Sequence, residues 1–129
     1  MDIALDKVCD LIARARAFDV KEADSDPDSG SNPIDDNAID TLSADGDDST
    51  EDEIRLMISG LNDDERHNLL ALVYIGRGDM EPEEWDAAVR LAADREAASS
   101  ISTGDWLLGL PNLGDLLDEG LAAMGRTCA

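Results

Sequence analysis

Negative charge is concentrated in one stretch of this chain, and that stretch limits how much of the chain can fold. The formal net charge is −21 over 129 residues. Residues 19–53 hold 14 acidic residues against a single base, Lys21, and so contribute −13 of that charge. The stretch has no aromatic residue and few aliphatic ones, so it cannot bury enough apolar surface to offset the entropy lost on ordering. We therefore expect residues 19–49 to form an acidic, largely disordered linker.

The N-terminal segment, residues 1–18, predicts one amphipathic helix over residues 3–18 with Asp2 as its N-cap. Leu5, Val8 and Ile12 follow one another at steps of three and four and form an apolar stripe. Each large side chain left in water would cost about 1.5–3 kcal/mol, which makes the stripe a candidate interface. Either packing of the helix onto its own bundle or formation of a homodimer would bury it, and both alternatives stay open.

Residues 50–126 predict a helical domain. Capping boxes begin at Thr50 and Asn62. Residues 69–75 are apolar on nearly all sides, which is typical of a central helix, and Gly76 is expected to end that helix in the left-handed conformation. No segment shows the sustained alternation of a strand. The predicted fold class is therefore all-α, a small bundle of five or six helices with the acidic linker after the first helix.

Glycines and tryptophans of this domain are predicted to shape its packing. Gly109, Gly114 and Gly120 lie in or beside short helices, where each interior glycine costs about 1 kcal/mol relative to alanine. They indicate close approach of helices, with room for a ligand as the alternative. Trp85 and Trp106 are expected to be core anchors, and either of them could line an interface.

Charge and apolar pattern exclude several function classes. Nucleic acid and anionic membranes repel so acidic a chain. The acidic excess is compatible with three explanations: solubility or adaptation to salt, which is the ordinary one, a basic protein partner, and divalent cation binding. The sequence has no apolar run near the ~20 residues of a membrane span and no secretion signal. Cys9 and Cys128 are isolated in the sequence, without Cys-x-x-Cys spacing, and two lone thiols are typical of a reducing compartment. We therefore expect a cytoplasmic protein.

The best candidate site is a four-residue turn after the predicted central helix, formed by Gly76, Arg77, Gly78 and Asp79. Its backbone N–H groups and guanidinium could bind an anion or a partner carboxylate. The alternative is a plain helix stop, in which Arg77 pairs with the nearby Asp79.

Metal sites and catalytic groups are only weakly indicated. His67 follows Asp63 and Asp64 by one helical turn, but one imidazole with two carboxylates of the same helix makes an incomplete site. Residues 24–35 place acids at the first, third and fifth positions of a calcium loop but lack its glycine at position six and its glutamate at position twelve. The serines at 99, 100 and 102 show no nucleophile motif. We assign no catalytic residue, no metal and no cofactor.

The second half of the chain resembles a known family. The resemblance rests on the run from Leu69 to Asp79 with its Gly-Arg-Gly-Asp, on Trp85, on Trp-Leu-Leu-Gly-Leu-Pro at 106–111, and on residues 113–121. These motifs are similar to the bacterial domain of unknown function 3775 family, and the resemblance spans residues 32–125. It implies an autonomous bacterial helical domain and brings no activity with it.

Two function classes remain. The favoured hypothesis is a non-enzymatic, acidic helical module for protein interaction, with a basic protein partner or with itself. The alternative is a small-ligand- or metal-binding protein centred on the turn at residues 76–79.

Overall fold

The computed structural model describes residues 1–24 and 50–128, which hold helices and no strand. The predicted all-α fold class is confirmed. The greater part of the predicted linker, residues 25–49, lies outside the described residues. The helices are α1 (Leu5–Asp24), an unlabelled helix described over 50–59, α3 (Asp63–Gly76), the 3-10 helix η2 (Pro82–Glu84), α4 (Trp85–Ala98), α5 (Thr103–Leu108) and α6 (Leu113–Ala123).

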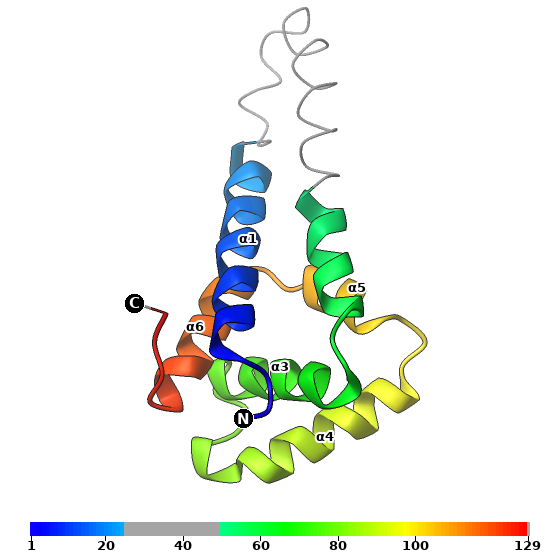
Figure 1. Cartoon of the computed structure of the whole chain (residues 1–129), viewed down its shortest axis with the longest axis vertical. Coiled ribbons are helices and arrows are strands. Elements are labelled where there is room, and N and C mark those ends of the chain that lie inside the picture. The colour runs from blue at the N-terminus through cyan, green and yellow to red at the C-terminus, as the bar shows by residue number, and fades with distance from the viewer. Residues whose placement is uncertain (25–49, 129) are drawn as a thin grey trace, which may run out of the picture.

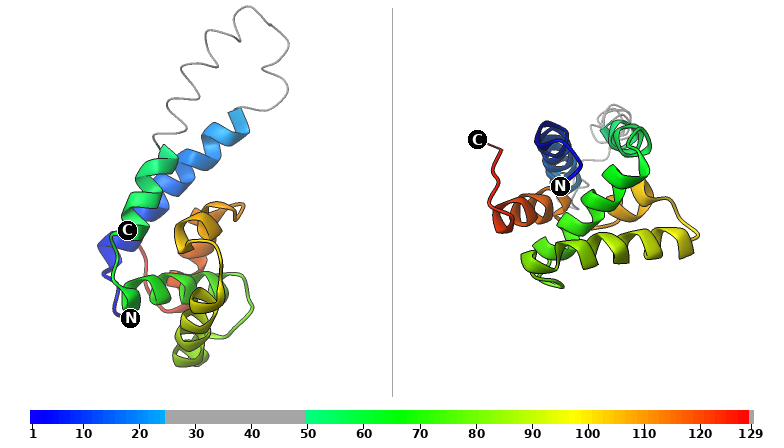
Figure 2. Two further views of the ribbon diagram at one scale, coloured as in Figure 1. Left: turned by 90° about the vertical axis from the view of Figure 1, so that its right-hand side faces the viewer. Right: turned by 60° about the horizontal axis from the view of Figure 1, so that its bottom comes forward.

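Helix α3 is the centre of the molecule, as its apolar sequence predicts. Residues 68–75 are all buried, since α6 packs on one side of the helix and α4 on another. Figure 1 shows α3 lying across the lower end of α1, with α4 beneath it and α6 beside α1. The helix at 50–59 lies alongside α1 in both views of Figure 2, and Arg14 of α1 pairs with Glu53 of that helix.

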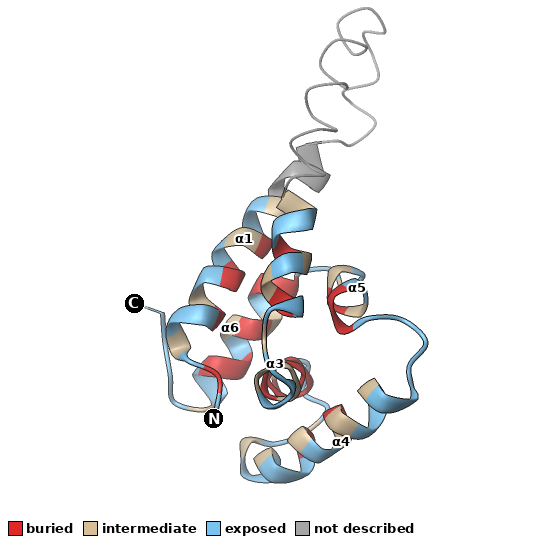
Figure 3. Cartoon of the chain, turned by 45° about the vertical axis from the view of Figure 1, so that its right-hand side comes forward, coloured by how far each residue is buried: buried red, intermediate tan, exposed pale blue. Residues whose placement is uncertain are grey.

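Helix α1 packs onto its own bundle in the structure. Val8, Leu11, Ile12 and Ala15 are each at most 3% exposed and belong to the single core cluster. The buried face of α1 turns toward α6 (Figure 3). The predicted apolar stripe is therefore buried within one chain, with Leu5 half-buried at its edge.

The ends of α1 differ from the prediction. The carbonyl of Ala4, rather than a cap on Asp2, accepts the first backbone bonds of the helix. Asp2 instead donates its backbone N–H to the buried side chain of Asn68 at 2.6 Å. The helix continues past residue 18 to Asp24.

Of the three predicted helix boundary signals, the one at Asn62 is confirmed, and those at Thr50 and Gly76 are placed differently in the structure. The capping box at Asn62 is confirmed, with reciprocal bonds between Asn62 and Glu65. Thr50 is itself helical, so it is not the cap of its helix. Gly76 is the last residue of α3 rather than the left-handed residue after it, and the positive φ of 83° belongs to Gly78.

The reason for a glycine at position 76 is close helix packing. A Cβ on Gly76 would lie 2.0 Å from the backbone oxygen of Leu116 in α6, and a Cβ on Gly120 would lie 2.3 Å from that of Leu72 in α3. Each helix thus holds a glycine where the other's backbone passes. The predicted role of Gly120 is confirmed, and Gly114 plays the same role against α1, whereas Gly109 has only its own helix nearby.

A disulfide joins Cys9 of α1 to Cys128 near the C-terminus. Their Cα atoms are 5.6 Å apart, a separation within the usual range for a disulfide. The prediction of two lone thiols is therefore wrong. The two residues are 119 positions apart in sequence, and only the packing of α1 against α6 brings them together.

None of the described helices is both long and apolar enough to cross a lipid bilayer.

Candidate functional site

The predicted turn at residues 76–79 is an exposed end of α3. Arg77 Nε lies 3.3 Å from Asp79 Oδ2, as the alternative of a plain helix stop expects. A Cβ on Gly78 would meet no non-neighbouring atom within 4 Å, whereas Gly76 packs against α6. The arginine is thus already paired within the turn, and its use as a binding site stays a prediction.

The predicted interface residues lie mainly in the interior. Val8 and Ile12 are buried, and Leu5, Trp85 and Trp106 are half-buried against the core. The ring of Trp106 meets that of Tyr74 edge to face, with centroids 6.3 Å apart. Trp106 also lines a surface cavity together with Leu70 and Tyr74.

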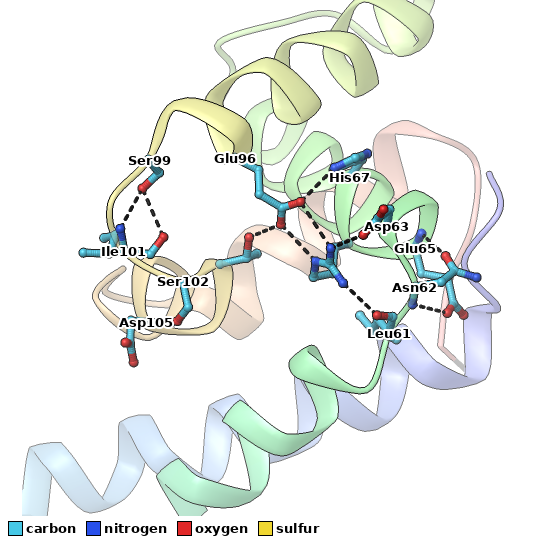
Figure 4. A network of polar contacts seen from close by, with 12 residues as sticks. Leu61, Asn62, Asp63, Glu65, His67, Glu96, Ser99, Ile101, Ser102 and Asp105 are labelled. Carbon is cyan, nitrogen blue, oxygen red and sulfur yellow. Dashed lines mark hydrogen bonds and ion pairs between the residues drawn. The ribbon is translucent and has the colours of Figure 1, made fainter.

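Outside the predicted turn, the carboxylate of Glu96, near the end of α4, lies at the centre of a polar network. It accepts hydrogen bonds from Arg66 Nε at 2.9 Å, from His67 Nε2 at 2.9 Å and from the Thr103 hydroxyl. Figure 4 shows this carboxylate between two side chains of α3 and the first residue of α5. Glu96 therefore ties three helices together at one point.

Burial and hydrogen bonds act on Glu96 in opposite directions. Burial alone would raise the pKa of the carboxyl, but the bonds from Arg66, Thr103 and His67 outweigh it and lower the pKa to about 2. The same contact raises the pKa of the Arg66 guanidinium. Near neutral pH the glutamate is thus ionised, with no proton to give to a substrate.

A groove of about 820 Å³ opens beside this network. It lies between the helix at 50–59, the first turns of α3, the end of α4 and the segment 101–104. Its rim carries Leu56, which is 71% exposed, and Ile101, which is 51% exposed. Among the residues that the structure describes, these two are the exposed large hydrophobic side chains, and both stand on the same groove.

The charges in and around the groove are unbalanced. Arg55 pairs with three carboxylates and Arg66 with two, so five negative charges face two positive ones. The net charge of these seven groups is −3. The five carboxylates belong to Glu51, Asp52, Asp63, Glu96 and Asp105. The groove thus combines apolar rim residues with an acidic surround.

A second cavity, of about 310 Å³, lies on the other side of Ile101 and Thr103, which line both hollows. Its walls include Leu70, Tyr74 and Trp106. Arg95 lies at this cavity with its Cζ 5.1 Å from the centroid of the Tyr74 ring.

Metal ligands do not gather in the described part of the chain, where no group of three or more His, Cys, Asp or Glu side chains is placed to hold an ion. His67 pairs with Glu96, whereas Asp63 pairs with Arg66. The pattern of His67 with the preceding aspartates therefore does not form a shared cluster. The calcium-loop pattern at residues 24–35 lies almost wholly outside the described residues.

Sequence reasoning missed the Glu96 network because two of its three partners, Arg66 and His67, lie about 30 residues away on another helix. Glu96 is 30 positions from Arg66 and 29 from His67, and no periodicity joins them. One local signal existed. An acid in the last turn of α4 opposes the helix dipole, so its presence there points to a compensating contact elsewhere in the fold.

The sequence pattern of one protein family, described as Protein of unknown function (DUF3775), matches residues 51–126. The chain belongs to this family, as the resemblance of its second half predicts. No curated protein matches the chain. No solved structure matches it either.

Proposed function

We propose that this protein is a non-enzymatic interaction module that binds a basic protein segment in the groove beside Glu96. The observation that carries the proposal is the coincidence of Leu56 and Ile101, the exposed large hydrophobics of the described residues, on the rim of one groove. Apolar side chains gathered in this way are typical of a docking surface rather than of scattered surface residues.

The acidic surround supports a basic partner over a second copy of the chain. The groups around the groove carry a net −3, and the whole chain carries −21. Two such chains repel each other, whereas a segment with lysines or arginines is attracted and steered toward the groove. A partner that places an apolar side chain between Leu56 and Ile101, with basic residues beside it, would satisfy both features.

The state of Glu96 supports a non-enzymatic role. A general acid or base works best with a pKa near the operating pH, whereas the pKa of Glu96 is about 2 and its oxygens are occupied by three partners. The bacterial source and the cytoplasmic location stay predictions of the sequence, and the disulfide removes the cysteine argument for the latter.

A double variant with Leu56→Ser and Ile101→Ser tests the proposal. Both side chains are exposed, so we expect the variant to keep the melting temperature of the wild type. Capture from a host lysate should yield a basic protein with the wild type and lose it with the double variant. The purified partner should bind more weakly as salt rises, because exposed charges are screened. Ala87→Ser on the exposed face of α4, outside the groove, is the matched control.

A partner retained by the double variant, or one whose affinity does not change with salt, would contradict this proposal. Self-association seen by light scattering, and lost in the same double variant, would replace the basic partner by a second copy.

A further inference from the structure

The smaller cavity, beside Ile101, has walls and polar groups that differ from those of the groove. Leu70, Tyr74, Ile101 and Trp106 give it apolar and aromatic walls. At about 310 Å³ it lies at the lower end of the range for ligand pockets. Such a space suits a small molecule or a single side chain with an aromatic or branched aliphatic body.

Most acceptors at this cavity are already used. The oxygens of Glu96 accept from Arg66, His67 and Thr103. The Ser99 hydroxyl is engaged with the backbone of Ile101, to which it donates and from which it accepts. These side chains therefore offer an incoming donor little to bind.

Donors, in contrast, are left over. The guanidinium of Arg95 makes no hydrogen bond or ion pair with any described residue, and it stands over the ring of Tyr74. The Tyr74 hydroxyl and the Trp106 indole N–H also have no hydrogen-bond partner among those residues. A cavity with apolar walls and unused donors, one of them a cation, is complementary to an acceptor that carries negative charge.

We propose that this cavity binds a ligand in which a carboxylate is joined to an aromatic or branched aliphatic body. Arg95 binds the carboxylate, while Tyr74 and Trp106 pack against the body. Two sources present this chemistry, a free small acid and the C-terminal residue of a peptide chain. The cavity shares Glu96, Ile101 and Thr103 with the groove, but its proposed ligand-binding residues, Arg95, Tyr74 and Trp106, do not line the groove.

The test follows the indole N–H resonance of Trp106 in nuclear magnetic resonance spectra of the full chain. The chain has two tryptophans, so a Trp85→Phe variant assigns the two signals. The probes are 3-phenylpropionate, its neutral analogue 3-phenylpropanol, and a short peptide ending in phenylalanine as the free acid or as the amide. We expect a saturable shift of the Trp106 signal with the acids and a much weaker one with the alcohol and the amide.

Arg95→Gln should weaken binding of 3-phenylpropionate at least tenfold, because hydrogen bonds to a charged group are lost. The same variant should bind 3-phenylpropanol as well as the wild type does. Arg90→Gln, an exposed arginine of the same helix, is the matched control and should bind like the wild type. Arg95→Lys keeps the positive charge but loses the planar set of donors, so its affinity for 3-phenylpropionate should lie between those of Arg95→Gln and Arg90→Gln. If Arg95→Gln does not fold, the affinity of Arg95→Lys tests the role of Arg95 instead.

Tighter binding of the peptide acid than of phenylpropionate assigns the cavity to a chain terminus, and the reverse order assigns it to a free acid. The proposal is overturned if no acid shifts the Trp106 signal saturably. It is equally overturned if acid and alcohol bind alike, or if the variants at position 95 bind the acid as tightly as Arg90→Gln does.

Discussion

At the scale of single residues, Glu96 shows how a side chain without a sequence motif can organise a surface. Among the described residues, its carboxylate is the point where α3, α4 and the start of α5 share hydrogen bonds. It also lines both the groove and the cavity. The charge on this residue therefore matters for the shape of both proposed sites.

Glu96→Gln should lower the free energy of unfolding by about 2–3 kcal/mol near neutral pH, since Arg66 loses one of its two carboxylate partners and keeps only the exposed Asp63. The folded pKa of Glu96, about 2, lies below its ordinary 4.5. The carboxylate thus stabilises the fold above pH 4.5, and this stabilisation is lost as the pH falls toward 2. Urea unfolding at several pH values should show that the difference in the free energy of unfolding between wild type and variant decreases as the pH falls from 4.5 toward 2.

Glu119→Gln is the control for this pH series. Glu119 is an exposed residue of α6 without an ion pair to any described residue, so its removal should leave the acid limb of the stability curve unchanged. If the difference in the free energy of unfolding between wild type and Glu96→Gln stays constant down to pH 2, the Glu96 carboxylate does not stabilise the fold through its charge.

At the scale of elements, the crossing of α3 and α6 depends on the absence of side chains. Gly76 and Gly120 each lie against the backbone of the opposite helix. Backbone atoms cannot rotate aside as a side chain can, so a methyl group at either position would push the two helices apart. The buried face of α3 would then lose its contact with α6.

Gly120→Ala should therefore destabilise the protein by about 3 kcal/mol or more, at the upper end of the usual cost of overpacking. Gly109→Ala is the matched control, because its nearest non-neighbouring atom is 3.4 Å away and its φ of −75° suits alanine. We expect that variant to be neutral or slightly stabilised. Thermal unfolding followed by circular dichroism compares the two, and equal melting temperatures would refute the packing argument.

Local patterns predicted the elements better than they predicted the contacts between them. The apolar run at 69–75 predicted the central helix, and the Asn62 box predicted its start, because both signals lie within a few residues. The local pattern predicts a turn role for Gly76. The structure shows that a side chain at this position would clash with the backbone of Leu116, some 40 positions along the chain. The groove, the cavity and the Glu96 network all join segments far apart in sequence, and no periodicity within one helix reveals such a meeting.

At the scale of the whole molecule, α1 is held by three kinds of contact. Its apolar face joins the core. Lys7 pairs with Glu65 of α3 at 2.6 Å, and Arg16 pairs with Asp115 and Asp118 of α6. The disulfide adds a covalent tie from Cys9 to the C-terminal end. The exposed ion pairs contribute little individually, so burial and the disulfide carry most of this attachment.

Cys9→Ser should lower the free energy of unfolding by about 2–4 kcal/mol, because the disulfide restricts the unfolded chain over a long loop. Cys128→Ser and the double variant should show the same loss, since all three remove one bond. Guanidinium unfolding with and without dithiothreitol measures it. Reductant should destabilise the wild type alone, and an effect of reductant on Cys9→Ser would contradict this account.

The disulfide also changes the topology of the chain, which becomes a closed ring from residue 9 to residue 128. One cut in a ring does not release a piece. A protease site inserted between residues 25 and 49 should therefore give a cleaved protein that runs as one species on a denaturing gel without reductant and as two with it. The cut product is in effect a circular permutant, in which the helix at 50–59 comes first and α1 follows α6 across a sulfur–sulfur bridge.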